Sequence, residues 1–282
     1  MSRRAFPWIA IAIGIAVAIY IATNTTGDYT VEPFNAPLED AVESAEITID
    51  ISSRDLIIDP LDRDAGDIIN GTADIVGSLE FNVSDESDRT IQLSEDTLNR
   101  SYRGTDPLEW EARITPEIPV LLNIVSSSGE IDADLTGLQL TGLNVNSSSG
   151  DPTITLPTLA DGLDVAMQTS SGNADLRLPD SFTGTLQLQT SSGELDITIG
   201  EQVSVTIDLS TSSGDSHITI PDEVGIRLDV RANSAGEITV PDRLRPVSVE
   251  DGEGVWETAD FETAEYTVML TVSVSSGDVT IR

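Results

Sequence analysis

Apolar and polar residues alternate along most of the chain from about residue 45 onward, with the period of two that is typical of a half-buried β-strand. Residues 47–51, 163–167 and 203–209 show the pattern clearly, since nearly every second position is Ile, Leu, Val or Met. No helical period appears after residue 22. The pattern predicts an all-β protein whose strands each bury one face.

A short motif recurs between these alternating segments: small residues, mostly Ser or Thr, then Gly, then Asp, Glu or Asn. Its glycines are Gly129, Gly150, Gly172, Gly193, Gly214, Gly236 and Gly277. The first six are 21 or 22 residues apart, and the last follows after 41. A fixed period of this length predicts a solenoid, in which each repeat buries a face of its neighbour.

Each interval between motifs holds two alternating segments. Residues 186–188 precede the motif that contains Gly193, for example, and residues 195–199 follow it. The predicted fold is therefore a two-strands-per-coil β-solenoid, a flattened and sandwich-like stack whose successive coils lie about 4.8 Å apart.

The repeats predict the organisation of the C-terminal part. Residues 126–282 are expected to form the regular solenoid, with an insertion near 242–265 that doubles the last interval. Trp256 and Phe261 in this insertion are expected to cover the last open coil, because an exposed sheet edge promotes aggregation.

The N-terminal part is less regular. Residues 45–125 form an irregular β region, in which Ser52–Asp55 is a degenerate copy of the motif with Arg54 at the glycine position. Residues 23–44 carry Pro33 and Pro37 among scattered acids without any period, so we expect an extended linker there.

The first residues predict a membrane anchor. Arg3 and Arg4 precede an uncharged segment, residues 5–22, which is just long enough to span a bilayer. We expect a retained signal-anchor with a cytoplasmic stub at 1–4 and an extracellular C-terminal domain. A cleaved signal peptide is the alternative.

Charge and composition narrow the class of protein. The net charge is −35, Lys is absent and the acids are spread along the chain, which favours a folded halophilic, archaeal protein in which salt screens self-repulsion. Nucleic acid is excluded as a partner because no basic patch is present. The absence of Cys excludes disulfides, thiol catalysis and cysteine metal sites.

The acid or amide after each motif glycine offers candidate chemistry. If the coils stay in register, these side chains stack along one edge, as a ladder of weak cation sites or as ordinary turn residues. We favour turn residues and interpret His217, the only histidine, as a strand residue. No catalytic, cofactor or metal residues are assigned.

Further features bear on surface chemistry. Five sequons are candidate N-glycosylation sites: Asn24, Asn70, Asn82, Asn99 and Asn146. The only Phe, Trp or Tyr between Gly129 and Val255 is Phe182, whereas sugar-cleaving sites combine aromatic platforms with paired carboxylates.

The stretch from Trp110 to Pro157 resembles a known group of families. Its order is a tryptophan strand, residues 110–114, then a Pro-x-Leu strand, residues 118–124, then the Asp-Leu-x-Gly-Leu turn, residues 134–138. This order is similar to that of the candidate-adhesin β-strand-repeat families and the related toast-rack and LiaF-like C-terminal domains. The resemblance covers residues 45–282 and implies the fold, but it supplies no catalytic motif. LiaF itself has several membrane spans, whereas one is expected here.

The predicted function is that of a non-enzymatic, membrane-anchored extracellular β-solenoid, an adhesin-like or envelope-associated interaction or scaffold module. Its expected partners are the membrane and an envelope protein or glycan. The alternative is a carbohydrate-active β-helix enzyme at the cell surface.

Overall fold

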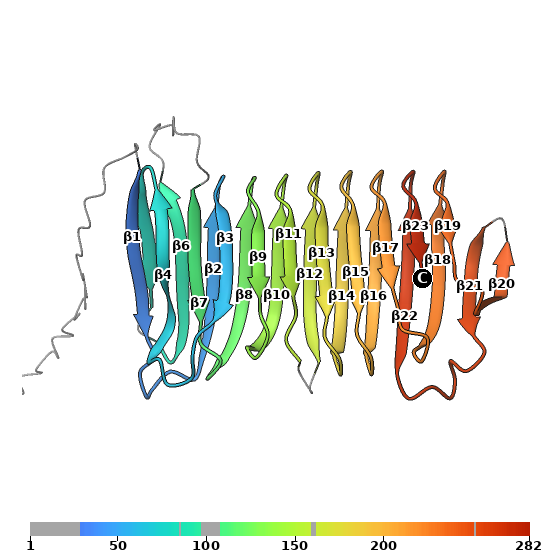
Figure 1. Cartoon of the computed structure of the whole chain (residues 1–282), viewed down its shortest axis with the longest axis horizontal. Helices are drawn as coiled ribbons and strands as arrows, with labels where there is room; N and C mark the ends of the chain where they lie inside the picture. The colour runs from blue at the N-terminus through green and yellow to red at the C-terminus, as the bar shows by residue number, and fades with distance from the viewer. Residues whose placement is uncertain (1–28, 85, 97–107, 159–161, 251) are drawn as a thin grey trace, which may run out of the picture.

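The computed structural model describes residues 29–282 except 85, 97–107, 159–161 and 251. These residues form two large β-sheets that pack face to face and extend along one axis (Figure 1). The prediction of an all-β protein is confirmed. Residues 5–22, the predicted membrane segment, lie outside the described residues. Within the described part, no helix has the length and apolar character to cross a membrane.

We name the sheets A and B. Sheet A consists, in spatial order, of β1 (Thr30–Pro37), β4 (Asp67–Ile75), β7 (Glu109–Ile114), β3 (Asp55–Pro60), β9 (Ile131–Asp134), β11 (Pro152–Thr155), β13 (Ala174–Leu178), β15 (Leu195–Ile199), β17 (Ser216–Thr219), β23 (Val279–Ile281) and β19 (Ile238–Thr239). Sheet B consists of β20 (Leu244–Glu250), β21 (Glu253–Thr258), β18 (Gly225–Asn233), β22 (Thr267–Val274), β16 (Ser204–Thr211), β14 (Thr183–Thr190), β12 (Leu163–Thr169), β10 (Gln139–Ser147), β8 (Pro119–Ser126), β2 (Ser44–Ile51), β6 (Asp88–Asp96) and β5 (Ser78–Val83).

Each regular coil runs along one strand of sheet B, turns at the motif and returns along one strand of sheet A. Neighbouring coils pair in parallel, so that Val165 lies opposite Leu186 and Leu176 opposite Ile197. Both pairs are 21 residues apart, which is the period of the sequence. The inward positions are buried and form one continuous apolar layer between the sheets. Each fully buried Val, Leu or Ile side chain in this layer contributes about 1.5–3 kcal/mol to the stability of the folded state.

The motif corner brings successive backbones into close contact. A Cβ added at Gly193 would overlap the carbonyl oxygen of Gly172, and the same holds at each motif glycine against the glycine of the adjacent coil. At Gly129 the neighbouring carbonyl belongs to Arg54, which confirms Ser52–Asp55 as a copy of the motif. Glycine recurs here because a side chain would force the coils apart.

On the inner side of this corner, buried hydroxyl groups form hydrogen bonds with the carbonyls of the motif glycines. The Thr211 hydroxyl donates to the carbonyl of Gly214 at 2.6 Å, and the Ser147 hydroxyl donates to that of Gly150 at 3.1 Å. Both hydroxyl residues are buried. Each of these two hydrogen bonds lies within a single corner. The hydrogen bonds across coils come from the backbone, as from the Ser192 amide to the Ser170 carbonyl at 2.9 Å.

The order of the coils in space differs from their order in the chain at both ends. The coil β2–β3 lies between β6–β7 and β8–β9, and the C-terminal coil β22–β23 lies between β16–β17 and β18–β19. The doubled interval before Gly277 contains the hairpin β20–β21, which the chain forms between β19 and β22. The chain first builds the outer coil and a hairpin, then returns to fill the gap inside them.

Antiparallel strands close the N-terminal end. In β1, Phe34 and Ala36 are buried while Pro33 and Pro37 are exposed, as suits an edge strand that needs no donor on its free side. This corrects the predicted linker at 23–44 for residues 30–37, because its apolar residues were too few and too interrupted by proline to show a period. The ring of Phe34 lies over Gly71 and 5.7 Å from that of Phe81.

The hairpin β20–β21 extends sheet B beyond β18 at the other end (Figure 1). Trp256 lies opposite Leu228 and packs against the core, as expected for a residue that covers an open coil. Arg243 attaches the hairpin to the turn between β17 and β18. Its guanidinium donates to the carbonyls of Ile220 at 3.0 Å, Pro221 at 2.8 Å, Asp222 at 2.6 Å and Val224 at 3.1 Å.

Gly193→Ala should destabilise the protein by about 2–3 kcal/mol, because the new methyl group must displace the backbone of the adjacent coil. Chemical denaturation monitored by circular dichroism measures the loss. Ser192→Ala, at an exposed position one residue away, is the control and should change stability by less than about 0.5 kcal/mol. Equal effects would mean that the contact does not limit the stacking.

Arg243→Ala should lower the free energy of unfolding by about 2 kcal/mol, because four carbonyls lose a charged donor. The exposed Arg245 on the same hairpin provides the control, and Arg245→Ala should have a small effect in the same denaturation experiment. A stable Arg243→Ala protein would show that the hairpin is held by apolar packing alone.

Candidate functional site

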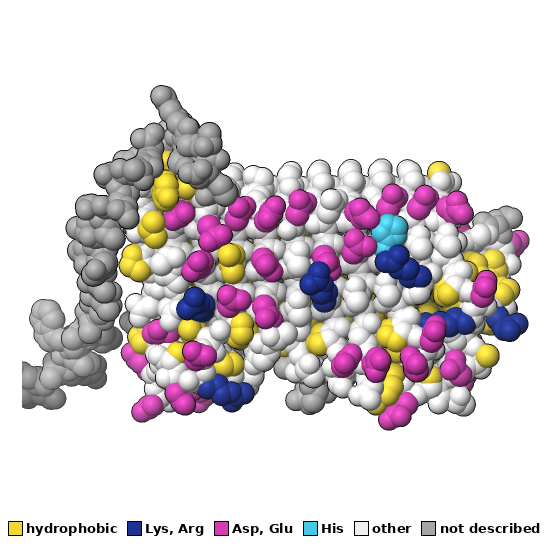
Figure 2. Space-filling view, in the orientation of Figure 1, with side chains coloured by type: hydrophobic (Ala, Val, Ile, Leu, Met, Phe, Trp, Pro, Cys, Tyr) yellow, Lys and Arg dark blue, Asp and Glu magenta, His cyan; other side chains and the backbone are white. Residues whose placement is uncertain are grey.

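The carboxylates of the corner residues accept hydrogen bonds from backbone amides of the adjacent coil. The carboxylate of Asp55 accepts a hydrogen bond from the amide of Glu130 at 2.9 Å, and that of Asp215 accepts one from the amide of Asp278, also at 2.9 Å. The amide of Asn173 likewise donates to Asp151 at 2.7 Å. Figure 2 shows the acids as a row along one edge of the slab. These contacts agree with the interpretation as turn residues, since the side chain caps the next coil.

The sequons lie in different surroundings. Asn82 on β5 and Asn146 on β10 are exposed, whereas Asn70 is half-buried and donates to the Asp67 carboxylate at 2.9 Å. Asn24 and Asn99 lie outside the described residues. Glycosylation at these positions stays a prediction.

The central part of the outer face of sheet B, between β2 at one side and β18 at the other, carries few charges. The six strands β8, β10, β12, β14, β16 and β22 contain only two charged residues, Asp164 and Asp208. Apart from Gln139, whose side chain donates to the Pro116 carbonyl, these strands carry six primary amides: Asn123, Asn144, Asn146, Gln168, Gln187 and Gln189. We call these six residues the amide face.

The register of sheet B arranges the amides in rows across the strands. Asn123 lies opposite Asn144, and Asn146 lies opposite Gln168, which in turn lies opposite Gln189. The Asn144 side chain donates to the side-chain oxygen, Oδ1, of Asn123 at 2.8 Å. Sequence reasoning missed this face, although the signal was present as amides at outward positions one period apart.

A shallow groove of about 370 Å³ crosses the amide face. It forms where Ala166, a small residue, occupies the position between Asn144 and Gln187. Asn146, Gln168 and Val125 line its other side. The groove therefore offers amide donors and acceptors around a small apolar floor.

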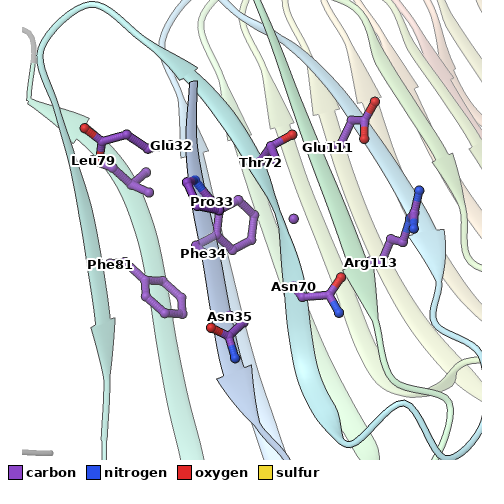
Figure 3. A pocket seen from close by; sticks show the side chains of 11 residues that line it. Glu32, Pro33, Phe34, Asn35, Asn70, Thr72, Leu79, Phe81, Glu111 and Arg113 are labelled. Carbon is purple, nitrogen blue, oxygen red and sulfur yellow. The ribbon is translucent and has the colours of Figure 1, made fainter. Parts of the chain in front are cut away.

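A larger groove, of about 580 Å³, lies at the N-terminal end. Phe34, Leu79 and Phe81 form its apolar side, and Glu111 and Arg113 lie across it (Figure 3). Phe34 is buried and the other two apolar residues pack against the core. We attribute this groove to the packing of the N-terminal edge strands.

The carboxylates with raised pKa lie elsewhere, on β4 and β7. Burial raises the pKa of Asp74, and the charge of Glu111 adds to this, while a hydrogen bond from the Glu109 amide and the charge of Arg54 oppose it. Burial and the neighbouring carboxylates also raise the pKa of Glu109. The neighbouring Trp110 is buried in the core, and neither acid lines a groove described above. The pair therefore lacks the open aromatic platform of a sugar-cleaving site.

No metal site is predicted from the sequence, yet the structure brings three potential metal ligands together on sheet A. Asp196 on β15 lies opposite His217 on β17, and Glu194 precedes β15 at the corner. The three side chains come together because Asp196 and His217 are one period apart in the sequence. Figure 2 shows the histidine beside acidic side chains.

Comparison with known families identifies the chain. The model of the family Toastrack DUF4097 matches residues 122–282, more than half of the chain. The chain belongs to the toast-rack family. The model of the N-terminal domain of toast_rack, DUF2154, matches residues 25–176. The resemblance predicted from residues 110–157 is thereby confirmed. No curated protein matches the sequence.

Three of the solved structures that are similar to this chain are bacterial proteins. A candidate cell adhesion protein from Clostridium sporogenes is 12% identical, with a TM-score of 0.38 over 90% of this chain and 98% of its own. A candidate adhesin from Bacteroides fragilis is 13% identical, with a TM-score of 0.40 over 90% and 97%. A candidate lipid-binding protein from Parabacteroides distasonis is 15% identical, with a TM-score of 0.44 over 91% and 98%. At these values the likenesses give this chain no function.

Asp74→Asn should raise the thermal unfolding temperature at neutral pH. A carboxyl whose pKa is raised on folding destabilises the folded state once the pH exceeds that raised pKa. The gain should shrink as the pH falls, and it should vanish below the ordinary value of 3.8, where Asp74 is protonated in both states. Thermal melts between pH 3 and 7 measure this. A pH-independent effect would contradict the argument.

Proposed function

We propose that this toast-rack protein is a non-enzymatic interaction module of the cell surface that binds an extended, neutral polysaccharide along the amide face. Residues 5–22 hold it at the membrane of a halophile, with the β-domain outside. The observation that carries the proposal is the amide-rich centre of sheet B, where six strands contain only two charged residues in a chain of net charge −35.

The chemistry of the face suits a hydroxyl-rich ligand. Each primary amide offers two donors and an acceptor, and sugar hydroxyls offer both in return. A ligand that binds here does not have to strip water from a row of carboxylates, which would cost free energy. The net negative charge repels polyanions over the whole surface, so a neutral polymer is favoured.

The geometry suits a polymer. The amide rows cross strands that are about 4.8 Å apart, so equivalent groups repeat along the stack. The groove beside Ala166 interrupts the face and supplies one position where a ring can lie closer to the sheet. In the described residues, the two acids with raised pKa lie outside this groove.

Binding of the full chain in detergent to a panel of neutral polysaccharides, with sulfated dextran as the anionic comparison, tests the proposal. Gln168→Glu with Gln187→Glu places two charges beside the groove and should weaken binding at least tenfold. The matched control, Thr155→Glu with Thr198→Glu, adds the same charge to outward positions of sheet A and should bind as the unmodified protein does.

Three results would contradict the proposal. The first is undiminished binding by the sheet B variant, and the second is preference for sulfated dextran. The third is release of shorter sugars from the bound polymer, which would favour the carbohydrate-active enzyme instead.

A further inference from the structure

The side chains of Glu194, Asp196 and His217 converge on the outer face of sheet A. One ligand atom from each lies within 4.8 Å of the others, and His217 Nε2 is 3.1 Å from Glu194 Oε1. They come from two neighbouring coils and belong neither to the amide face nor to the N-terminal groove. We propose that these three residues form a binding site for a divalent transition-metal ion of the Zn²⁺ type.

The donor set fits such an ion. Zn²⁺ takes imidazole nitrogen and carboxylate oxygen at about 2.0–2.2 Å, and an open site has three protein ligands with water in the fourth position. Two ligands on a tetrahedral ion at these lengths lie roughly 3.4 Å apart. The separation of 3.1 Å between His217 and Glu194 is close to this value, so small side-chain rotations complete the site.

The surroundings leave the site with surplus negative charge. Arg177, on the neighbouring strand β13, is paired with Asp175 at 2.6 Å. Among the described residues, the Asp196 carboxylate has no hydrogen-bond or ion-pair partner outside the cluster that it forms with Glu194 and His217. The imidazole and the two carboxylates together offer three ligand atoms to a cation, whereas a simple His217–Glu194 ion pair would leave Asp196 unused.

The backbone beneath the site is rigid. β15 pairs in parallel with both β13 and β17, and the side chains on the opposite face, Ile197 and Ile218, are buried in the core. Ligands on adjacent paired strands keep their spacing without any loop that has to close. A site held in this way loses little entropy when the ion binds.

The single histidine makes the test direct. Zn²⁺ is titrated into the ¹⁵N-labelled full chain in detergent at constant ionic strength, and the signals of the only imidazole are followed by NMR. The proposal expects a saturable shift of Nε2 with a stoichiometry of one. His217→Gln should weaken Zn²⁺ binding more than tenfold by calorimetry, and Glu194→Gln and Asp196→Asn should each weaken it about tenfold.

A matched control separates this site from general attraction to an acidic surface. Glu130 occupies the same corner position as Glu194, but Thr153 stands where the next coil would need its histidine. Glu130→Gln should change the affinity less than twofold. An imidazole that does not respond to Zn²⁺, or equal weakening by Glu130→Gln and Glu194→Gln, would overturn the proposal. Neither outcome bears on the polysaccharide, because the amide face lies on the other sheet.

Discussion

The close approach of backbones at the motif corner governs the whole architecture. Successive glycines lie so near to one another that a Cβ has no room, and the amides of the serines just before each glycine donate to the adjacent coil. This contact fixes the distance between coils at one edge. Strand register, the alignment of buried side chains and the ladder of corner carboxylates all follow from it, because a solenoid transmits the geometry of one coil to the next.

Two different surfaces result from one repeat. In the regular coils, the outward positions of sheet B are mostly amides and hydroxyls with two aspartates, whereas those of sheet A include more acids, an arginine and the histidine. The period places equivalent residues of successive coils side by side in rows across the strands. A substitution in one coil therefore changes one member of a row of neighbouring side chains. Binding surfaces can thus be placed on one sheet while the other keeps the acidic character that a salty medium favours.

The sequence was sufficient for the regular part of the fold because its signals are local. The motif glycines, the alternating strands and the copy at Ser52–Asp55 could each be read within one repeat. β1 was not predicted because Pro33 and Pro37 are typical of linkers, although they are also tolerated in an edge strand. The position of β22–β23 could not be predicted, since it depends on pairing with β16 and β18 across long stretches of chain. The amides and the Glu194, Asp196 and His217 cluster were visible only as residues one period apart, and register was needed to bring them together.

The placement of β22–β23 inside the stack has a consequence for how the chain folds. The C-terminal coil is synthesised last, yet its neighbours β16–β17 and β18–β19 stand on both sides of it. Until it arrives, two strand edges in each sheet lack partners, and contacts between distant segments form slowly. The stack is therefore complete only when residues from the C-terminal part of the chain pair in its interior, between β16–β17 and β18–β19.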